Sequence, residues 1–213
     1  MTSLEAILFD LDGTLVDSLP VMKEVYVAFA RAHGFPPSDA EFDSLNGPSL
    51  EEIIRHLKEK HCIKETHAKL AATYGGLIRK SYVEKAAPCK GAVRLLRRCR
   101  DKGVKCLLVT SSSREIAQAW IQHHKWSHFF QGHVYGDDVE KAKPNGDIYR
   151  LAMERYALHP SVAVVVEDSV NGVLAAKDAG LAVIGVGNNV DALLAAGARD
   201  VAASLDEVAQ AIL

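Results

Sequence analysis

Short, continuous runs of apolar residues alternate with amphipathic stretches over most of this 213-residue chain. Four runs are almost free of polar residues, at 6–9, 104–109, 162–166 and 182–186. Continuous apolarity is typical of a strand that is covered on both faces, as in a parallel sheet. Amphipathic patterns between and after the runs predict helices at 91–102, 113–124, 144–156 and 169–179. The pattern therefore predicts an α/β fold with a doubly wound, Rossmann-like parallel sheet.

The stretch from 17 to 87 has a different pattern. It contains no convincing strand, and Val21, Val25 and Phe29 follow one another at the spacing of a helix face. Turn signals at "HGFPPS" and "NGPS" separate its helical parts. We expect an inserted α-helical domain at 17–87, with residues 1–16 and 88–213 forming the α/β core domain.

Composition excludes several classes of protein. The chain is 48% hydrophobic and 24% charged, with a formal net charge of −2, which argues against disorder and against binding to nucleic acid or membrane surfaces. One basic cluster, Arg94 to Lys105, contains Val93, Leu96 and Cys99 at helical spacing. This cluster is therefore expected to be the solvated face of a helix.

The cysteines indicate a reducing compartment. Cys62, Cys89, Cys99 and Cys106 form no C-x-x-C pair and have no histidines at zinc-site spacing, so reduced thiols are expected. The N-terminus lacks a basic, cleavable apolar segment, and no run approaches the roughly 18 apolar residues of a membrane span. We expect a cytoplasmic protein.

Polar residues follow the predicted strands at the points where the strands end. Asp10 ends the first run and Asp12 lies two residues on, Thr110 ends the second run, and Glu167 and Asp168 end the third. In doubly wound sheets ligands bind at the carboxyl ends of the strands, so these groups are expected to meet. Carboxylates that meet at one point repel each other unless a cation lies among them, and oxygen ligands favour Mg²⁺.

Lys143 is expected at the same edge. Pro144 favours an extended conformation for Lys143 and suits the start of the following helix. A lysine and a hydroxyl beside Mg²⁺ suit the oxygens of a phosphoryl group, so the residues predict phosphoryl transfer. Lys141 is the weaker alternative because it lies farther from the proline.

Several of these residues have a purely structural alternative. Ser111, Ser112 and Ser113 compete with Thr110 as phosphate ligands. Ser112 and Glu115 have the spacing of a capping box, which predicts a structural role for Ser112. Glu167 and Asp168 could cap the helix that begins near Ser169, and Asp17 could be either a helix cap or a functional residue.

Four segments together resemble the motifs of the haloacid dehalogenase superfamily of phosphotransferases. They are "DLDGT" (10–14), Thr110 at a strand end, Lys143 in "KP", and "EDS" (167–169). The helical insert resembles the small cap domain of that superfamily. The likeness covers essentially the whole chain and is strongest to the branch of phosphoglycolate phosphatases, sugar-phosphate phosphatases and β-phosphoglucomutases.

The resemblance implies a role for each residue at the site. Asp10 would attack phosphorus and carry an aspartyl-phosphate, while Asp12 would act as general acid and base. Mg²⁺ would be held by Asp10, the backbone carbonyl of Asp12 and Asp168, with Glu167 binding it directly or through water. Backbone N–H groups would bind the phosphoryl oxygens together with the side chains of Thr110, Ser111 and Lys143.

The expected substrate is a small phosphorylated metabolite: a sugar phosphate, a polyol phosphate or phosphoglycolate. A helical cap that closes over the sheet edge would exclude a folded phosphoprotein. Asn46, Ser49 or Arg55 could contact the part of the substrate beyond the phosphate, or they could only begin and solvate a cap helix. We expect a monomer or weak dimer with no nucleic-acid or membrane partner.

Two other classes of function remain as alternatives. A phosphomutase of the β-phosphoglucomutase type is disfavoured, because Met22 stands where those mutases place a histidine, and the loop at 46–52 lacks their arginine. A catalytically silent phospho-receiver or interaction module is disfavoured as well. A receiver phosphorylates an aspartate on its third strand and needs no helical insert.

Overall fold

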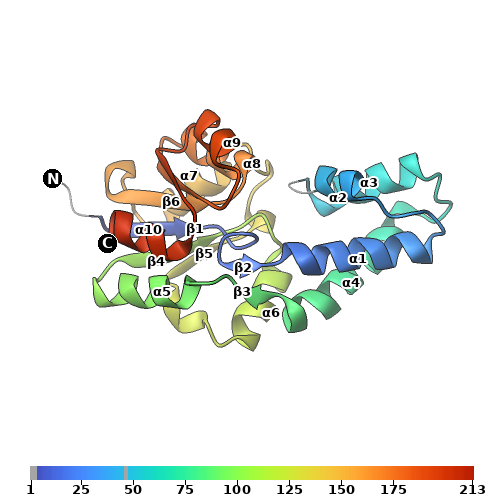
Figure 1. The fold of residues 1–213 in the computed structure, drawn as a ribbon, viewed down its shortest axis with the longest axis horizontal. Helices are drawn as coiled ribbons and strands as arrows, with labels where there is room; N and C mark the ends of the chain where they lie inside the picture. The colour runs from blue at the N-terminus through green and yellow to red at the C-terminus, as the bar shows by residue number, and fades with distance from the viewer. Residues whose placement is uncertain (1–3, 46–47) are drawn as a thin grey trace. The chain divides into compact units, whose positions relative to one another are not determined.

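The computed structural model describes residues 4–45 and 48–213, and the chain divides into two compact units (Figure 1). Met1–Asp17 and Ala87–Leu213 form one, called here the core unit, and Ser18–Ala86 form the other, called the helical unit. The domain boundaries expected from the sequence lie one residue outside Ser18 and Ala86.

The core unit is built on a six-stranded sheet in which all neighbouring strands are parallel. Its order is β5-β4-β1-β6-β7-β8, with bounds β1 (Ala6–Phe9), β4 (Lys105–Val109), β5 (Gly132–Val134), β6 (Ala163–Glu167), β7 (Ala182–Val186) and β8 (Asp200–Ala202). From β1 the chain first adds β4 and β5 on one side and then adds β6, β7 and β8 on the other. This change of direction makes a topological switch point beside the central strand β1. The predicted α/β class and parallel sheet are confirmed.

Helices cover both faces of the sheet. They are α5 (Ala92–Asp101), α6 (Arg114–His123), α7 (Asp147–Arg155), α8 (Val170–Asp178), α9 (Val190–Ala195) and α10 (Leu205–Ile212), with 3₁₀ turns η1 (Ser127–Phe129), η2 (Gly136–Asp138) and η3 (Pro160–Val162). Figure 1 shows α7, α8 and α9 on one side of the sheet and α5 on the other. All four residues of β1 are fully buried, which explains the continuous apolar run in the sequence.

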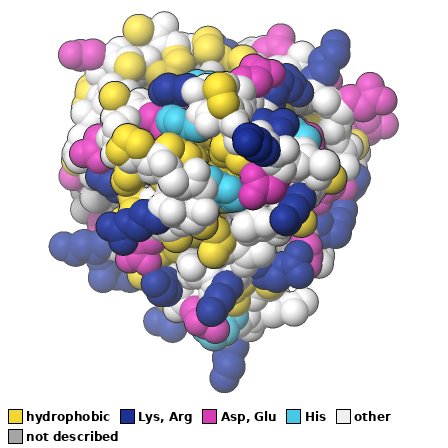
Figure 2. Space-filling view, turned by 90° about the vertical axis from the view of Figure 1, so that its right-hand side faces the viewer, with side chains coloured by type: hydrophobic (Ala, Val, Ile, Leu, Met, Phe, Trp, Pro, Cys, Tyr) yellow, Lys and Arg dark blue, Asp and Glu magenta, His cyan; other side chains and the backbone are white. Residues whose placement is uncertain are grey.

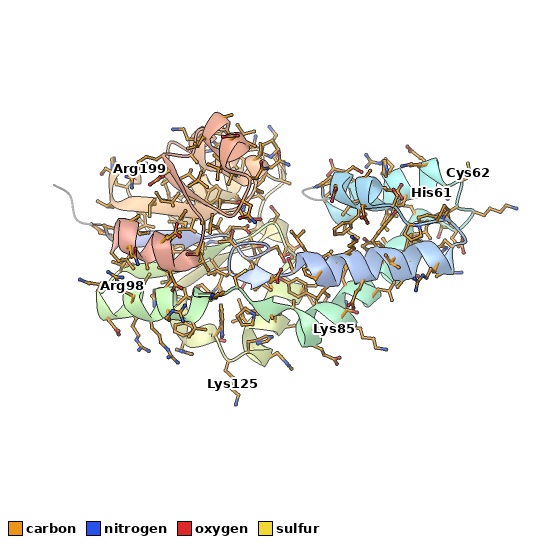
Figure 3. All side chains as sticks on the ribbon, viewed as in Figure 1. His61, Cys62, Lys85, Arg98, Lys125 and Arg199 are labelled. Atoms are coloured by element: carbon orange, nitrogen blue, oxygen red, sulfur yellow. The ribbon has the colours of Figure 1, made fainter. Side chains whose placement is uncertain are left out.

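Details of the helices differ from the sequence-based prediction. The helix expected from Pro144 begins at Asp147, after a turn that ends at the N-cap Gly146. On α5, Leu95, Leu96 and Cys99 are buried, and Arg98 points away from the unit (Figure 3). The basic cluster is therefore an exposed helix face, as predicted.

The helical unit contains α1 (Leu19–Ala32), α2 (Asp39–Ser44), α3 (Leu50–Lys60) and α4 (His67–Lys85). The two-residue strands β2 (Val16–Asp17) and β3 (Ala87–Pro88) pair antiparallel in the core unit, where the chain leaves it and returns. Val21, Val25 and Phe29 are buried on α1, and Phe29 packs edge-to-face on Tyr74 of α4 with ring centroids 5.0 Å apart. None of the helices in the described ranges combines the length and apolarity that crossing a membrane requires.

A buried carboxylate joins three elements of the helical unit. Glu41 on α2 accepts hydrogen bonds from the Tyr26 hydroxyl at 2.5 Å and contacts His61 Nε2 at 2.8 Å and Lys60 Nζ at 2.9 Å. Burial alone would raise the pKa of Glu41, but the hydrogen bonds from Tyr26, Lys60 and His61 outweigh it and lower the pKa from 4.5 to about 2.

Figure 2 shows basic, acidic and histidine side chains interspersed on one face of the molecule, so that face carries no large field of one sign.

Glu41→Gln is expected to lower the free energy of unfolding of the helical unit by about 2 kcal/mol at neutral pH, because the buried site loses charge-assisted hydrogen bonds. Since the folded pKa of Glu41 is depressed, its contribution is complete above pH 4.5 and is lost as pH falls toward about 2. Denaturant unfolding at pH 7 and pH 3 measures both effects. The matched control is Glu24→Gln on the exposed pair with Lys85, which should change stability by no more than about 0.5 kcal/mol. Equal stability of Glu41→Gln and wild type at pH 7 would contradict the account.

Candidate active site

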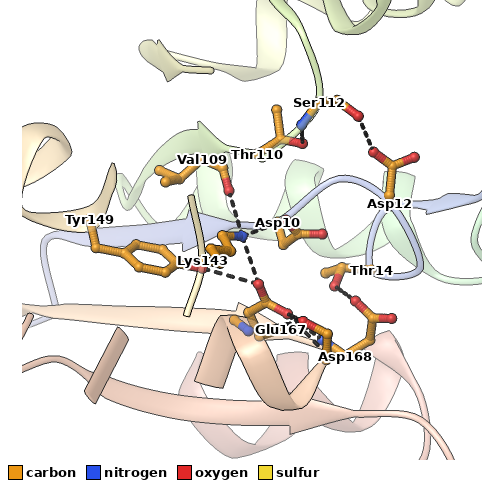
Figure 4. Close-up of polar contacts among 12 residues, drawn as sticks. Asp10, Asp12, Thr14, Val109, Thr110, Ser112, Lys143, Tyr149, Glu167 and Asp168 are labelled. Carbon is orange, nitrogen blue, oxygen red and sulfur yellow. Dashed lines mark hydrogen bonds and ion pairs between the residues drawn. The ribbon is translucent and has the colours of Figure 1, made fainter. Parts of the chain in front are cut away.

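The strand register brings the predicted polar residues to one edge of the core unit. Phe9 at the end of β1 lies opposite Leu108 of β4 and Val166 of β6. The next residue, Asp10, donates its backbone N–H to the Val166 carbonyl at 3.1 Å, and its side chain points toward the other site residues (Figure 4). The carboxyl ends of three adjacent strands therefore supply one site, as the sequence predicted.

The loop after β1 is fitted closely to Asp168. Gly13 has φ +85°, and a Cβ there would lie 2.1 Å from Asp168 Oδ2, so both the backbone and the close approach require glycine. Thr14 is buried and donates its hydroxyl to Asp168 Oδ1 at 2.8 Å. Thr14 thus orients Asp168, a function that the sequence analysis did not assign, although the residue belongs to the quoted "DLDGT".

Lys143 lies at the centre of the site with its side chain 6% exposed. Its ammonium donates to Asp10 Oδ1 and Glu167 Oε1, each at 2.7 Å, and to the Val109 carbonyl at 3.3 Å. Burial alone would lower the pKa of Lys143, but Asp10 and Glu167 raise it well above its usual value. Lys143 is therefore a fixed, permanently charged group beside Asp10.

Glu167 is held by an unusually full set of donors. Its Oε1 accepts from Lys143 and, at 3.3 Å, from the Tyr149 hydroxyl. Its Oε2 accepts from the backbone N–H groups of Asp168 and Ser169 and from the Ser169 hydroxyl, each at 3.0 Å. A Cβ at Gly172 would come within 1.7 Å of Glu167 Oε1, so α8 can pass this carboxylate only with glycine there. Glu167 is oriented by both of its oxygens.

Three carboxylates form a cluster that could hold a metal ion. One oxygen each of Asp10, Glu167 and Asp168 lies within 4.8 Å of the others. Burial and the neighbouring carboxylates raise the pKa of Asp10 well above its usual value, and burial with the charge of Glu167 raises the pKa of Asp168 to about 7. Both shifts report that ionised carboxylates at this place are costly without further positive charge. The cluster fits a hard divalent cation, since its donors are all oxygen and one lysine does not balance three acids.

Asp12 and Thr110 lie on the side of Asp10 that faces away from Glu167 and Asp168 (Figure 4). The Ser112 hydroxyl donates to Asp12 Oδ2 at 2.5 Å, and the Ser112 N–H donates to Thr110 Oγ1 at 3.0 Å. The prediction that Ser112 caps α6 is wrong: Ser113 is the N-cap and accepts from the Ile116 N–H. With Ser113 as the N-cap in an extended conformation, Ser112 lies one residue before the cap, and its hydroxyl donates to Asp12 instead.

The remaining predicted residues are placed as follows. Ser111 is exposed beside Thr110. Ser49 is the N-cap of α3 and forms a reciprocal capping box with Glu52, and Arg55 is exposed on the same helix. Ser49 thus has the structural function that the sequence analysis left open for it, and Asn46 lies outside the described residues. The core-unit residues Asp10, Asp12, Thr110, Lys143, Glu167 and Asp168 are the ones that come together.

Known proteins match this chain over nearly its full length. A family model for haloacid dehalogenase-like hydrolases matches residues 7–186. Validoxylamine A 7′-phosphate phosphatase of Streptomyces hygroscopicus subsp. limoneus is 32% identical over 204 residues, which are 94% of each chain. Hexitol phosphatase A of Escherichia coli is 34% identical over 188 residues, covering 86% of this chain and 83% of its own. A solved structure of a candidate β-phosphoglucomutase from Thermotoga maritima has 30% identity and a TM-score of 0.83, and the match covers 98% of both chains.

An acid cluster with a buried lysine at the edge of a doubly wound sheet, together with these matches, defines a hydrolytic enzyme. The chain belongs to the family of haloacid dehalogenase-like hydrolases. The resemblance stated from the four motifs is confirmed, and so is the predicted class of enzyme, a phosphatase.

Proposed function

We propose that this protein is a Mg²⁺-dependent phosphatase that acts on a phosphorylated sugar or sugar alcohol through a phosphorylated Asp10. One observation carries the proposal: the Asp10 carboxylate lies within hydrogen-bond distance of a buried lysine and within the cluster of acids that could hold a metal. A carboxylate nucleophile, a cation for the phosphoryl oxygens and a metal-capable acid pair are the parts that phosphoryl transfer requires.

In the first step, a carboxylate oxygen of Asp10 attacks phosphorus in line with the ester oxygen that leaves. The bond from Asp10 to phosphorus forms while the bond from phosphorus to the substrate oxygen breaks. Lys143 neutralises charge on the phosphoryl oxygens, and Thr110 and backbone N–H groups after Asp10 donate to them. In the second step, water attacks phosphorus and the Asp10 carboxylate is released with inorganic phosphate.

Asp12 moves the proton in both steps. It protonates the departing alcohol oxygen and then accepts a proton from the attacking water, which occupies the same place. The Ser112 hydroxyl donates to Asp12 Oδ2 at 2.5 Å, and this contact holds the carboxylate in one orientation. Ser112 therefore orients the acid and does not itself touch phosphorus.

Asp10, Asp168 and the backbone carbonyl of Asp12 would hold the metal, and Mg²⁺ suits this oxygen donor set. When bound, the metal supplies positive charge to the phosphoryl group and to the clustered carboxylates. Both oxygens of Glu167 accept hydrogen bonds, from Lys143 and Tyr149 and from the backbone just before α8, which supports a positioning function for Glu167. Lys143 donates to Oδ1 of Asp10 and Thr14 donates to Oδ1 of Asp168, so the Oδ2 atom of each would be the metal ligand.

Removing the metal is expected to destabilise the protein. At a Mg²⁺ concentration about a hundredfold above its Kd, binding should raise the Tm by about 5–10 °C over the chelator-treated sample, since the ion relieves the repulsion among the acids. Thermal scans in MgCl₂ and in EDTA measure the shift. Asp168→Asn should lose it, whereas the exposed Asp101→Asn should keep it. A shift that persists in Asp168→Asn would place the metal elsewhere.

The substrate class is proposed from the relatives, which include a hexitol phosphatase and a validoxylamine A 7′-phosphate phosphatase. The test is a comparison of kcat/KM with Mg²⁺ for hexose phosphates, hexitol phosphates, phosphoglycolate and a phosphorylated protein. The proposal predicts preference for a sugar or sugar-alcohol phosphate, release of inorganic phosphate, and no activity in EDTA. Conversion of one sugar phosphate into its isomer without phosphate release would identify a mutase and contradict the proposal. Preference for the phosphoprotein would contradict the proposed small-molecule partner.

A further inference from the structure

Tyr149 is a buried side chain next to the site that the proposed chemistry does not use. It lies on α7 and is fully buried, packed in the same apolar cluster as Val109, Ile148 and Val165. Its hydroxyl lies 3.3 Å from Glu167 Oε1, and the Lys143 ammonium lies 5.1 Å from its ring centroid. Tyr149 therefore contacts both partners of the central ion pair.

The Lys143 ammonium is surrounded by three oxygen acceptors and by the Tyr149 ring. Three acceptors, Asp10 Oδ1, Glu167 Oε1 and the Val109 carbonyl, take the hydrogen atoms of the ammonium. Figure 4 shows the Tyr149 side chain directed toward Lys143 and Glu167 from the side opposite Asp10. A cation over an aromatic face is attracted by the ring, most strongly where water is excluded, as it is here.

The hydroxyl of Tyr149 is the weaker of the two contacts. At 3.3 Å its hydrogen bond to Glu167 is long, and Glu167 Oε1 already accepts from Lys143 at 2.7 Å. The ring, by contrast, is an aromatic contact of the ammonium, and the other contacts named above are all oxygen acceptors.

We propose that Tyr149 is a positioning residue whose ring keeps the Lys143 ammonium in the site when a phosphoryl group takes the place of Asp10 as its partner. The inference rests on the proposed function, in which Lys143 binds phosphoryl oxygens. Lys143 must then share or exchange the bond to Asp10, and a long flexible side chain needs contacts that do not change during the exchange. Glu167, the Val109 carbonyl and the ring are those contacts.

The test compares Tyr149→Phe, which removes only the hydroxyl, with Tyr149→Leu, which removes the ring. Tyr149→Phe should stay within about twofold of wild type in kcat/KM and in the Kd for inorganic phosphate with Mg²⁺, while Tyr149→Leu should weaken both about tenfold. Should Tyr149→Leu not fold, Tyr149→Met fills more of the same space and replaces it. Calorimetry with inorganic phosphate measures the Kd directly.

Tyr156 provides the matched control on the same segment. Its hydroxyl bonds to the backbone of His133, where it accepts from the N–H at 2.8 Å and donates to the carbonyl at 3.3 Å. Tyr156→Leu should lower the Tm and leave phosphate affinity unchanged. The expected result is therefore a loss of phosphate affinity in Tyr149→Leu that its loss of Tm does not explain.

A third measurement separates this inference from the proposed function. The ε-methylene carbon of Lys143 is bonded to the ammonium that lies 5.1 Å from the ring centroid, so its protons should show an NMR shift that Tyr149→Phe preserves and Tyr149→Leu removes, with Lys143→Met assigning the signal. An unchanged Lys143 signal, or equal losses of phosphate affinity in the Phe and Leu variants, would overturn the inference. If the wild-type protein hydrolyses no phosphate ester, the proposed function fails, and the Lys143 signal still decides whether the ring positions the lysine.

Discussion

Asp10→Asn is expected to reduce kcat for the preferred phosphate ester by at least about a thousandfold, because an amide cannot replace the carboxylate as nucleophile. Folding should be unaffected, since asparagine has the same shape and Lys143 retains Glu167 and the Val109 carbonyl as acceptors. Removal of one charge from a crowded acid cluster also relieves repulsion. Steady-state kinetics with a thermal scan of the same sample measures both properties.

Asp17→Asn is the matched control for this experiment. Asp17 is exposed at the end of β2, seven residues after Asp10, and should tolerate the same substitution with unchanged kcat. Turnover by Asp10→Asn at more than about a tenth of the wild-type rate would show that another group attacks phosphorus.

Asp12→Asn should lower kcat for an alkyl phosphate by about a hundredfold to a thousandfold, the usual contribution of a general acid. Release of the leaving group in the first step should slow much less for nitrophenyl phosphate, because nitrophenolate leaves without protonation. The affinity for inorganic phosphate should change little, since the proposed metal contact of residue 12 is a backbone carbonyl. Single-turnover release of the leaving group from the two substrates measures the difference.

Ser112→Ala separates orientation of Asp12 from its chemistry. The variant removes the 2.5 Å hydrogen bond to Asp12 and should reduce kcat for the alkyl phosphate only about tenfold, roughly the value of one hydrogen bond to a charged group. Equal slowing of leaving-group release from the alkyl and nitrophenyl esters in Asp12→Asn would exclude Asp12 as the acid.

Much of the fold and site could be predicted because burial leaves a strong pattern. The strands β1, β4, β6 and β7 are covered on both faces and therefore appear as continuous apolar runs. Three of them, β1, β4 and β6, end at or just before a residue that apolar surroundings do not explain: Asp10, Thr110 and Glu167. Parallel pairing then determines that these ends meet, so Asp10, Lys143, Glu167 and Asp168 could be grouped without coordinates.

Other features leave no such pattern. The strands β5 and β8 have three residues each and lie at the sheet edges, too short for a continuous apolar run, and neither was predicted. The cap of α6 was misplaced because Ser112 and Ser113 both suit an N-cap, and the difference between them depends on Asp12, a hundred residues earlier in the sequence. Tyr149 resembles any apolar position of an amphipathic helix, since its contact with Lys143 is a tertiary one.

The central claim is that Asp10 carries the phosphoryl group. The most direct test is a single-turnover reaction of Asp12→Asn with Mg²⁺ and nitrophenyl phosphate, whose leaving group needs no acid, quenched in acid and analysed by peptide mass spectrometry. This variant should accumulate the intermediate, because the water that attacks the aspartyl-phosphate has lost its base. The account predicts one phosphoryl group on the peptide that contains Asp10, absent from the Asp10→Asn protein and from samples in EDTA. Formation of inorganic phosphate over the same time course with no label on Asp10 would contradict it.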